Sequence, residues 1–381
     1  LVGSEMCIRD STTSALTATV GEDPLRILAI HAHPDDETLY TGGTLAAYRA
    51  AGAETAVLTC TLGEEGEVIG STYAQLVVAA GGADQLGGYR IHELTGALQA
   101  LGAGTPHFLG GAGHFRDSGM LSTPANDHPR AFLGADPEHV ADLMACWIRW
   151  MRPHIVLVYD DAGTYGHPDH IRAHQCGVRA VHTAAQQADT SVAQLREAGM
   201  LADPQWTADY QQRHHTVLTS GESLVVEDDA LSAAWDVPLV YWMMQSERRV
   251  AAGLADIADA IPAQWTLPAA CDIFATDDAA ATHTVTLDSA AYAAKVAALQ
   301  AHATQVTVFQ APEGPVSFAM SNNIAQPLLH TEEFRLVRQS HHVDAADPTD
   351  IAAGLAAIKL ETDSAEWQPC DESVSYTHLT L

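Results

Sequence analysis

The sequence contains few basic residues. Among its 381 residues, Lys and Arg total 18 whereas Asp and Glu total 48, which gives a formal net charge of −30. A chain with this balance lacks the basic surface needed to follow a phosphate backbone or an anionic membrane. The composition therefore argues against nucleic acid and membranes as partners.

Cysteine and long apolar runs are also scarce. The six cysteines form no C-x-x-C pair, a pattern typical of a reduced cytoplasmic protein rather than a disulfide framework. No apolar run reaches the roughly 18 residues that a membrane-spanning helix needs. No basic segment followed by an apolar stretch marks a signal peptide. These features predict a cytoplasmic location, and the 47% of hydrophobic residues suffices for a folded core.

The chain is expected to have a central folded part between less regular ends. Residues 1–11 and 373–381 resemble translated sequencing-adaptor fragments rather than natural protein, and the chain is expected to pack little after Arg338. The predicted segments are a non-native or disordered leader at 1–23, a metal-binding α/β catalytic core at 24–187, an acidic insertion at 188–236, a part at 237–340 that completes the substrate cleft, and a tail at 341–381.

Short apolar strands alternate with helical segments along the central part. Strands are predicted at 25–31, 55–61, 107–109, 153–160, 237–244 and 282–287, and helices at 38–51, 83–101, 137–151, 170–185 and 290–303. This alternation predicts an α/β fold, a Rossmann-like and mostly parallel sheet flanked by helices, with a smaller C-terminal α+β part. Ligands of such sheets bind at the carboxyl ends of the strands.

Two histidine-rich motifs follow predicted strands. The segment His33-Pro-Asp-Asp-Glu follows the first strand, and His167-Pro-Asp-His follows the strand at 153–160. Catalytic zinc sites keep three protein ligands and one open position for water. At the end of a strand, the side chains of His33 and Asp36 can both point inward as ligands, and Asp35 then remains as a carboxylate that binds no metal. The second motif would provide the third ligand. The residue types therefore predict metal-assisted amide hydrolysis with general acid–base help.

Longer segments resemble a known family. The matching segments are HAHPDDE at 31–37, TCTLGEEGEVIG at 59–70, DQLGGYRIHEL at 84–94, LGGAGHFRDSGM at 109–120, YGHPDH at 165–170, AAKVAALQAHATQV at 293–306 and SNN at 321–323. On these segments the sequence resembles the LmbE-like, or PIG-L, family of N-acetylglucosaminyl deacetylases. The resemblance is greatest to the branch of mycothiol biosynthesis. It implies hydrolysis of the N-acetyl group of 1D-myo-inositol 2-acetamido-2-deoxy-alpha-D-glucopyranoside, with release of acetate.

The resemblance also implies a cofactor. One zinc ion per subunit would be held by His33, Asp36 and His170, and Asp35 would act as the general base. Fe(II) fits the same ligands. Nothing in the sequence indicates an oligomeric state.

Further roles follow from the same resemblance. His167 would act as the electrophilic or acid partner, oriented by Asp169, and Tyr165 would help to polarise the amide carbonyl. Arg90 and Asp117 match the positions that bind the hydroxyl groups of the sugar and the inositol.

Some residues allow more than one interpretation. Arg90 could instead form a surface ion pair with Glu93, and Asp117 could be only a turn residue. His302 follows a predicted helix, where it could line the substrate cleft or interact with the helix dipole.

Other functions fit part of the pattern. A mycothiol S-conjugate amidase would share the metal site and cleave a different amide. A non-haem iron oxygenase also uses two histidines and a carboxylate, although such enzymes usually have all-β folds. A dinucleotide-dependent oxidoreductase is excluded because the first loop carries acidic side chains instead of G-x-G-x-x-G. A sugar-binding module without activity would need a damaged site, whereas every expected side chain is present.

Overall fold

The computed structural model describes residues 16–78, 84–186, 197–200, 234–269, 272–312, 314–340, 343 and 347–355. The predictions for residues 1–15, for the extreme C-terminal end and for most of the acidic insertion lie outside these residues. The predicted leader at 1–23 is wrong for residues 16–23, because Val20 is buried in the main hydrophobic cluster and Thr17 N donates to Asp350. Within the described ranges, no helix combines the length and the apolar character needed to cross a bilayer.

The fold is built on a seven-stranded sheet of order β5-β4-β3-β6-β7-β12-β8. Five strands run parallel and the last two pair antiparallel. The parallel strands are β5 (His107–Phe108), β4 (Glu54–Thr59), β3 (Arg26–His31), β6 (Ile155–Val158) and β7 (Leu239–Met244), followed by β12 (Thr331–Gln339) and β8 (His283–Thr286). The central strands are apolar and buried, as expected for strands covered on both faces. The predicted α/β fold is confirmed.

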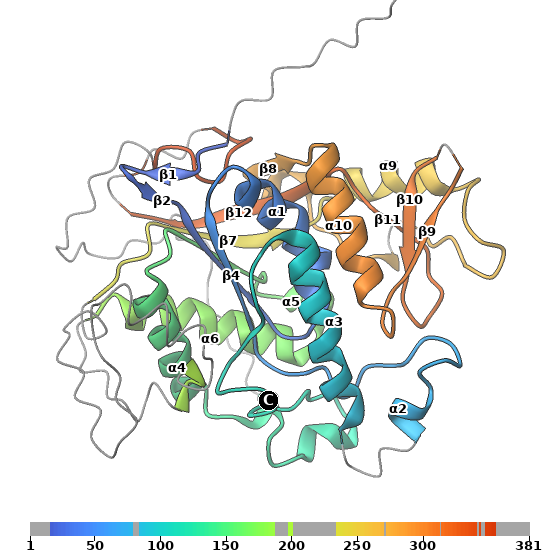
Figure 1. Ribbon diagram of the computed structural model, residues 1–381, viewed down its shortest axis with the longest axis horizontal. Coiled ribbons are helices and arrows are strands. Elements are labelled where there is room, and N and C mark those ends of the chain that lie inside the picture. The colour runs from blue at the N-terminus through green and yellow to red at the C-terminus, as the bar shows by residue number, and fades with distance from the viewer. Residues whose placement is uncertain are drawn as a thin grey trace, which may run out of the picture.

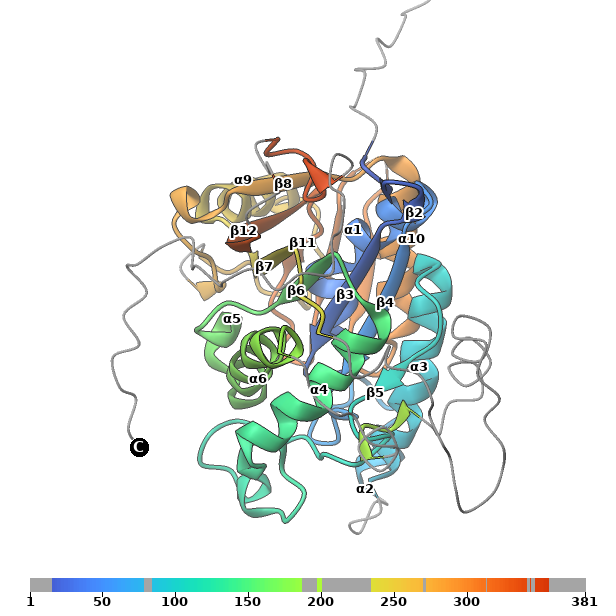
Figure 2. The ribbon, with the colours of Figure 1, turned by 90° about the vertical axis from the view of Figure 1, so that its left-hand side faces the viewer.

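Helices cover both faces of this sheet. Figures 1 and 2 show α4 and α6 on one side and α1, α3 and α10 on the other. Their bounds are α1 (Gly42–Ala50), α3 (Gln85–Leu101), α4 (Pro137–Met151), α6 (Pro168–Ala184) and α10 (Ser289–Ala301). The predicted bounds of α4 are confirmed: the Asp136 carboxylate accepts from the backbone N–H of Glu138, and Pro137 occupies the first turn.

A smaller antiparallel sheet belongs to the C-terminal part. It contains β9 (Thr307–Gln310), β10 (Val316–Ala319) and β11 (Gln326–Pro327), with α9 (Glu247–Ile257) packed beside it (Figure 1). The remaining elements are short: β1 (Thr19–Val20), β2 (Asp23–Pro24), α2 (Gln75–Val78), α5 (Gly163–Gly166), the π-helical turn η1 (Glu37–Thr41), and the 3₁₀ turns η2 (Pro124–Asp127), η3 (Phe132–Gly134) and η6 (Asp278–Ala280).

The described part of the C-terminal tail is packed against the core. Ile351 and Leu355 are fully buried in the main hydrophobic cluster. The Asp350 carboxylate accepts hydrogen bonds from the Tyr48 hydroxyl at 2.5 Å and from the backbone N–H of Thr17 at 2.9 Å. The prediction that the chain packs little after Arg338 is therefore wrong for this segment. Its few apolar residues lie among small and acidic ones, so its composition resembles that of a loop.

The strand order places a topological switch point beside β3. The chain leaves β3 and forms β4 on one side, then returns to form β6 on the other. The loops that follow β3 and β6 therefore meet at the carboxyl edge of the sheet, where open α/β sheets bind their ligands. Both histidine motifs lie in these two loops.

At the opposite edge, a buried histidine makes stability depend on pH. His154 accepts the backbone N–H of Arg26 through Nδ1 at 3.0 Å, and burial, together with the charge of Arg26, lowers the pKa of His154 to about 3. The unfolded chain takes up this proton near pH 6.5, so stability decreases as the pH falls from 6.5 towards 3.

We expect His154→Asn, which keeps an acceptor near Nδ1, to flatten this dependence. Over this range its free energy of unfolding should decrease more slowly than that of the wild type, by up to about 1.4 kcal/mol per pH unit for one proton. Denaturant unfolding at several pH values measures both slopes, and equal slopes would contradict the prediction.

Candidate active site

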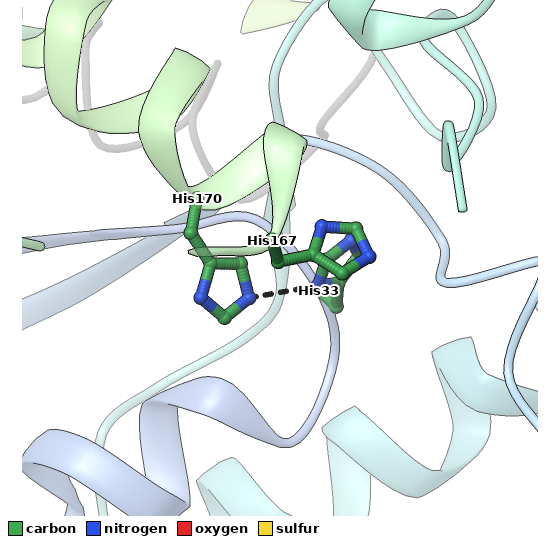
Figure 3. Close-up of side chains that lie close together, drawn as sticks. All are labelled: His33, His167 and His170. Carbon is green, nitrogen blue, oxygen red and sulfur yellow. Dashed lines mark hydrogen bonds between the residues drawn. The ribbon is translucent and has the colours of Figure 1, made fainter. Parts of the chain in front are cut away.

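Three buried ligand atoms converge at the switch point. His33 Nδ1 lies 3.2 Å from His170 Nε2, and each of these nitrogens lies 3.3 Å from Asp36 Oδ2. Figure 3 shows His33, His167 and His170 close together, with a dashed line joining His170 to His33. A tetrahedral zinc ion with bonds of about 2.0–2.1 Å separates its ligand atoms by about 3.3–3.4 Å. The triangle therefore has the size of one face of a zinc tetrahedron.

The outer nitrogens of both histidines have partners that fix the ring protons. His33 Nε2 donates towards Asp169 Oδ2 at 3.3 Å and lies 3.5 Å from Asp117 Oδ1. The Thr164 hydroxyl donates to the carbonyl of Gly163 at 2.7 Å, so it accepts from His170 Nδ1 at 3.3 Å. Metal-binding histidines are oriented in this way. Both inner nitrogens are thereby left with lone pairs beside a carboxylate oxygen, an arrangement that a cation stabilises.

Tyr159 orients the aspartate of this set. Its hydroxyl donates to Asp36 Oδ2 at 2.7 Å and accepts the backbone N–H of Ala32 at 2.8 Å. Its ring stacks on His170 with centroids 4.3 Å apart. The sequence analysis did not identify Tyr159, although its place directly after a buried strand was a usable signal.

Among the residues that the structure describes, two other triads also bring possible ligand atoms within 4.8 Å of one another. These are His33, His167 and His170, and His33 with Asp117 and Asp169. All three sets share His33. The set with Asp36 is favoured because its three distances are nearly equal and match tetrahedral coordination.

The carboxylate of Asp169 makes its hydrogen bonds with residues other than His167. Its Oδ2 accepts the backbone N–H of Ser118 at 2.9 Å and faces His33. Only the backbone N–H of Asp169 reaches His167, where it donates to Nδ1 at 3.2 Å. The prediction that Asp169 orients His167 is therefore wrong for the side chain. The physical reason is that α6 begins here, so His167 caps the helix while the Asp169 side chain points inward.

His167 is a neutral hydrogen-bond donor in this environment. Burial, with the nearby His33 and His170, lowers the pKa of His167 to about 3. Because Nδ1 accepts a backbone N–H, the single ring proton resides on Nε2. Of the two roles expected for His167, electrophile or acid, this environment favours the electrophile.

Asp35 lies next to the triangle without being one of its corners. Its Oδ2 accepts from Arg90 Nη2 at 2.9 Å, and the side chain is buried but lines the cleft. Burial raises the pKa of Asp35 to about 7, although the charge of Arg90 acts in the opposite direction. A carboxylate that titrates near neutral pH is suited to general-base chemistry.

The buried guanidinium of Arg90 forms hydrogen bonds with Asp35 and with two loops. Besides Asp35, its guanidinium donates to the carbonyl of Gly63 at 2.7 Å and to that of Pro34. Gly63 has φ +65°, and a Cβ there would lie 1.9 Å from Arg90 Nη1, so only glycine leaves room. The alternative of a surface ion pair with Glu93 is wrong, because Glu93 accepts two hydrogen bonds from Thr304.

We expect Arg90→Ala to lower kcat by about 10²-fold, because Asp35 would lose the partner that fixes its carboxylate. Arg90→Lys keeps the charge but not the forked geometry, and should retain an intermediate rate. Steady-state kinetics with a glycoside and with free N-acetylglucosamine would test this. An unchanged kcat with only a higher KM for the glycoside would assign Arg90 to substrate binding alone.

Asp117 accepts hydrogen bonds within a turn and also lines the cleft. Its Oδ1 accepts from Gly119 N at 2.8 Å, and its Oδ2 accepts from Glu65 N at 3.2 Å. Burial would raise the pKa of Asp117, but the neighbouring His33 holds it below its usual value. Asp117 lines the cleft, so its predicted contact with substrate hydroxyls stays a prediction.

Two corners of the triangle, His33 and Asp36, line a cleft of about 750 Å³. Residues between His33 and His167 and residues between Met244 and Glu333 contribute to its walls. Tyr165, which is 51% exposed, lies at the cleft with its ring centroid 5.1 Å from that of His170. Further lining residues include Glu65, Glu67, Met120, Lys295, Gln305, Phe318, Asn322 and Glu333.

Comparison with known proteins identifies the family. Residues 28–181 match the family described as PIG-L: GlcNAc-PI de-N-acetylase. A protein from Nocardia farcinica is 47% identical over 353 residues, covering 89% of this chain and 98% of that protein. The chain belongs to the PIG-L family. Relatives from Rhodococcus opacus (46% identity, 82% of this chain and 91% of that protein) and Mycolicibacterium smegmatis (43%, 87% and 97%) are similar over most of their length. All three are named 1D-myo-inositol 2-acetamido-2-deoxy-alpha-D-glucopyranoside deacetylase.

The PIG-L match covers the part of the chain that builds the site. It begins in β3 and ends in α6, so it includes both histidine motifs, Arg90 and Asp117. The predicted family is confirmed, and this member of a deacetylase family is an enzyme with a buried His/Asp group that could hold a metal ion.

Proposed function

We propose that the protein is a zinc-dependent deacetylase that hydrolyses the N-acetyl group of 1D-myo-inositol 2-acetamido-2-deoxy-alpha-D-glucopyranoside, releasing acetate in mycothiol biosynthesis. The observation that carries this proposal is the triangle of His33, Asp36 and His170, with His33, Asp36 and the neighbouring Asp35 lining the cleft. The three relatives, 43–47% identical, support the choice of substrate.

The metal would be held by His33 Nδ1, Asp36 Oδ2 and His170 Nε2. When bound, a divalent ion of this kind polarises a carbonyl oxygen and lowers the pKa of water at its open position. Both zinc and Fe(II) suit two imidazoles and a carboxylate. Zinc is proposed because the ligand spacing fits a tetrahedron.

Different side chains around the triangle act as the base and as the hydrogen-bond donor. Asp35 accepts a proton from the water that attacks the amide carbon, and this proton is the one that the leaving amine needs. His167 donates its Nε2–H to the carbonyl oxygen as negative charge develops there. Tyr165 is proposed to assist at the same oxygen from the rim of the cleft.

The cleft fits a small polar glycoside. Pockets of about 300–1,000 Å³ bind ligands of this size. Arg90, Asp117 and the acidic side chains of Glu65 and Glu67 provide partners for hydroxyl groups. We propose that these residues select the inositol glycoside over free N-acetylglucosamine.

The test is acetate release from three substrates by the metal-loaded enzyme. Mass spectrometry would follow the inositol glycoside, a mycothiol S-conjugate and free N-acetylglucosamine. The highest kcat/KM is expected for the inositol glycoside, with the same rate when oxygen is removed. A higher kcat/KM for cleavage of the conjugate would favour the amidase, and a requirement for oxygen would favour an oxygenase.

We also propose a cytoplasmic location. Cys60, Cys146 and Cys176 are buried and free, as in proteins of reducing compartments. Fractionation of the producing cells would test this, and recovery of the enzyme outside the cytoplasm would contradict it.

A further inference from the structure

The backbone of Asp35 has a conformation that its neighbours must hold in place. Its φ is +114°, a value that residues with a Cβ rarely adopt. Its N–H donates to Glu37 Oε2 at 2.9 Å. Its carbonyl accepts from the N–H groups of Thr38 and Leu39 at 3.0 and 2.9 Å. The peptide of Asp35 is therefore held at both its donor and its acceptor.

Glu37 itself forms a hydrogen bond with a residue 265 positions later in the sequence. The side chain of Glu37 is fully buried, and it does not line the cleft. Its Oε1 accepts from the Thr38 hydroxyl at 2.5 Å and from His302 Nε2 at 2.8 Å. His302 is also fully buried and caps the C-terminus of α10. Neither interpretation made from the sequence, a cleft-lining residue or a residue facing the helix dipole, describes this contact.

The segment that carries His302 is anchored on several sides. The carbonyl of His302 accepts from the N–H groups of Gln305 and Val306, both at 2.9 Å. Thr304 donates its N–H and its hydroxyl to Glu93, both at 2.7 Å. The imidazole of His302 therefore has little freedom to leave Glu37.

We propose that Glu37 and His302 are positioning residues for the reaction. They form a chain of contacts from α10 through His302 and Glu37 to the backbone N–H of Asp35, while Arg90 holds the Asp35 carboxylate from the other side. The proposal rests on the proposed function, in which Asp35 is the base. It explains why the first motif ends in Glu37 although Glu37 neither lines the cleft nor belongs to the metal triangle.

The primary test removes the donor from Glu37. His302→Leu should lower kcat for the inositol glycoside by about 10²-fold, because a small displacement of a catalytic group has an effect of this size. KM and the zinc content per chain should remain those of the wild type, and so should the visible spectrum of the Co²⁺-substituted enzyme. His302→Gln, which returns an N–H donor near the position of Nε2, should restore most of kcat.

Thr304→Val is the matched control. It removes a hydrogen bond to a buried carboxylate from the same segment, but Thr304 has no hydrogen bond to Glu37 or Asp35. It should lower Tm about as much as His302→Leu does while leaving kcat unchanged. A similar loss of kcat in Thr304→Val would overturn the proposal, because loosening of the segment would then explain the effect. Loss of zinc from His302→Leu would overturn it as well.

A double-mutant cycle with Asp35→Asn decides whether His302 acts through the base. Adding His302→Leu to Asp35→Asn should cause little further loss of kcat, because the base is already absent. Multiplicative losses would overturn the positioning role and leave Asp35 as the base. A wild-type rate for Asp35→Asn alone would instead overturn the assignment of the base in the proposed function.

Discussion

His170→Ala is expected to remain folded but to lose its bound metal and its deacetylase activity. His170 provides one of three corners of the triangle, and its Nε2 lies 3.2 Å from His33 Nδ1 and 3.3 Å from Asp36 Oδ2. Loss of an outer partner of a metal ligand typically lowers metal affinity by about 10–100-fold, and loss of the ligand itself should have a larger effect. Elemental analysis, chelator competition and acetate release measure these quantities.

His174→Gln provides the matched control on the same helix. His174 is a buried histidine one turn further along α6, where it contacts the carbonyl of Tyr159 at 2.8 Å and packs on Trp242. Its substitution removes a comparable ring without touching the triangle, so the metal should stay bound. Wild-type metal content in His170→Ala would contradict the proposed ligand set, whereas metal loss in both variants would indicate damage to α6.

Asp35→Asn is expected to keep the metal and to lose kcat by about 10²–10⁴-fold, the range that general-base catalysis contributes. Asparagine has nearly the shape of aspartate, and its side-chain oxygen can still accept the hydrogen bond that Asp35 Oδ2 accepts from Arg90. The amide cannot take a proton from water, so the chemical step should slow while substrate binding is largely retained.

The same kinetic and metal analyses apply to Asp161→Asn as a control. Asp161 is an exposed carboxylate in the loop after β6 and does not line the cleft, so both rate and metal content should be unchanged. If Asp35→Asn lost metal and rate together, Asp35 would belong to the ligand set and another group would have to serve as the base.

The sequence by itself determined the fold class, the family and the location of the chemistry. Its apolar runs correspond to β3 and β6, and the Asp-Pro start of α4 defines that helix. These signals are local, because an apolar run and a capping residue each involve positions close together in the chain. Given a parallel sheet, strands of the same direction bring the two histidine motifs to one edge. The meeting of the two histidine motifs could therefore be predicted, whereas the choice of His33, Asp36 and His170 within them followed from the family resemblance.

Only the tertiary structure decided which side chains orient that group. Asp36 accepts a hydrogen bond from Tyr159, which directly follows β6. The Asp169 carboxylate faces His33, and the backbone N–H of Asp35 donates to Glu37. Glu37 in turn contacts His302, which lies 265 positions away in the sequence. No local periodicity encodes such contacts. They depend on how helix α10 packs against α1 and α3. They also depend on the rotamers that buried polar groups adopt to satisfy their hydrogen bonds.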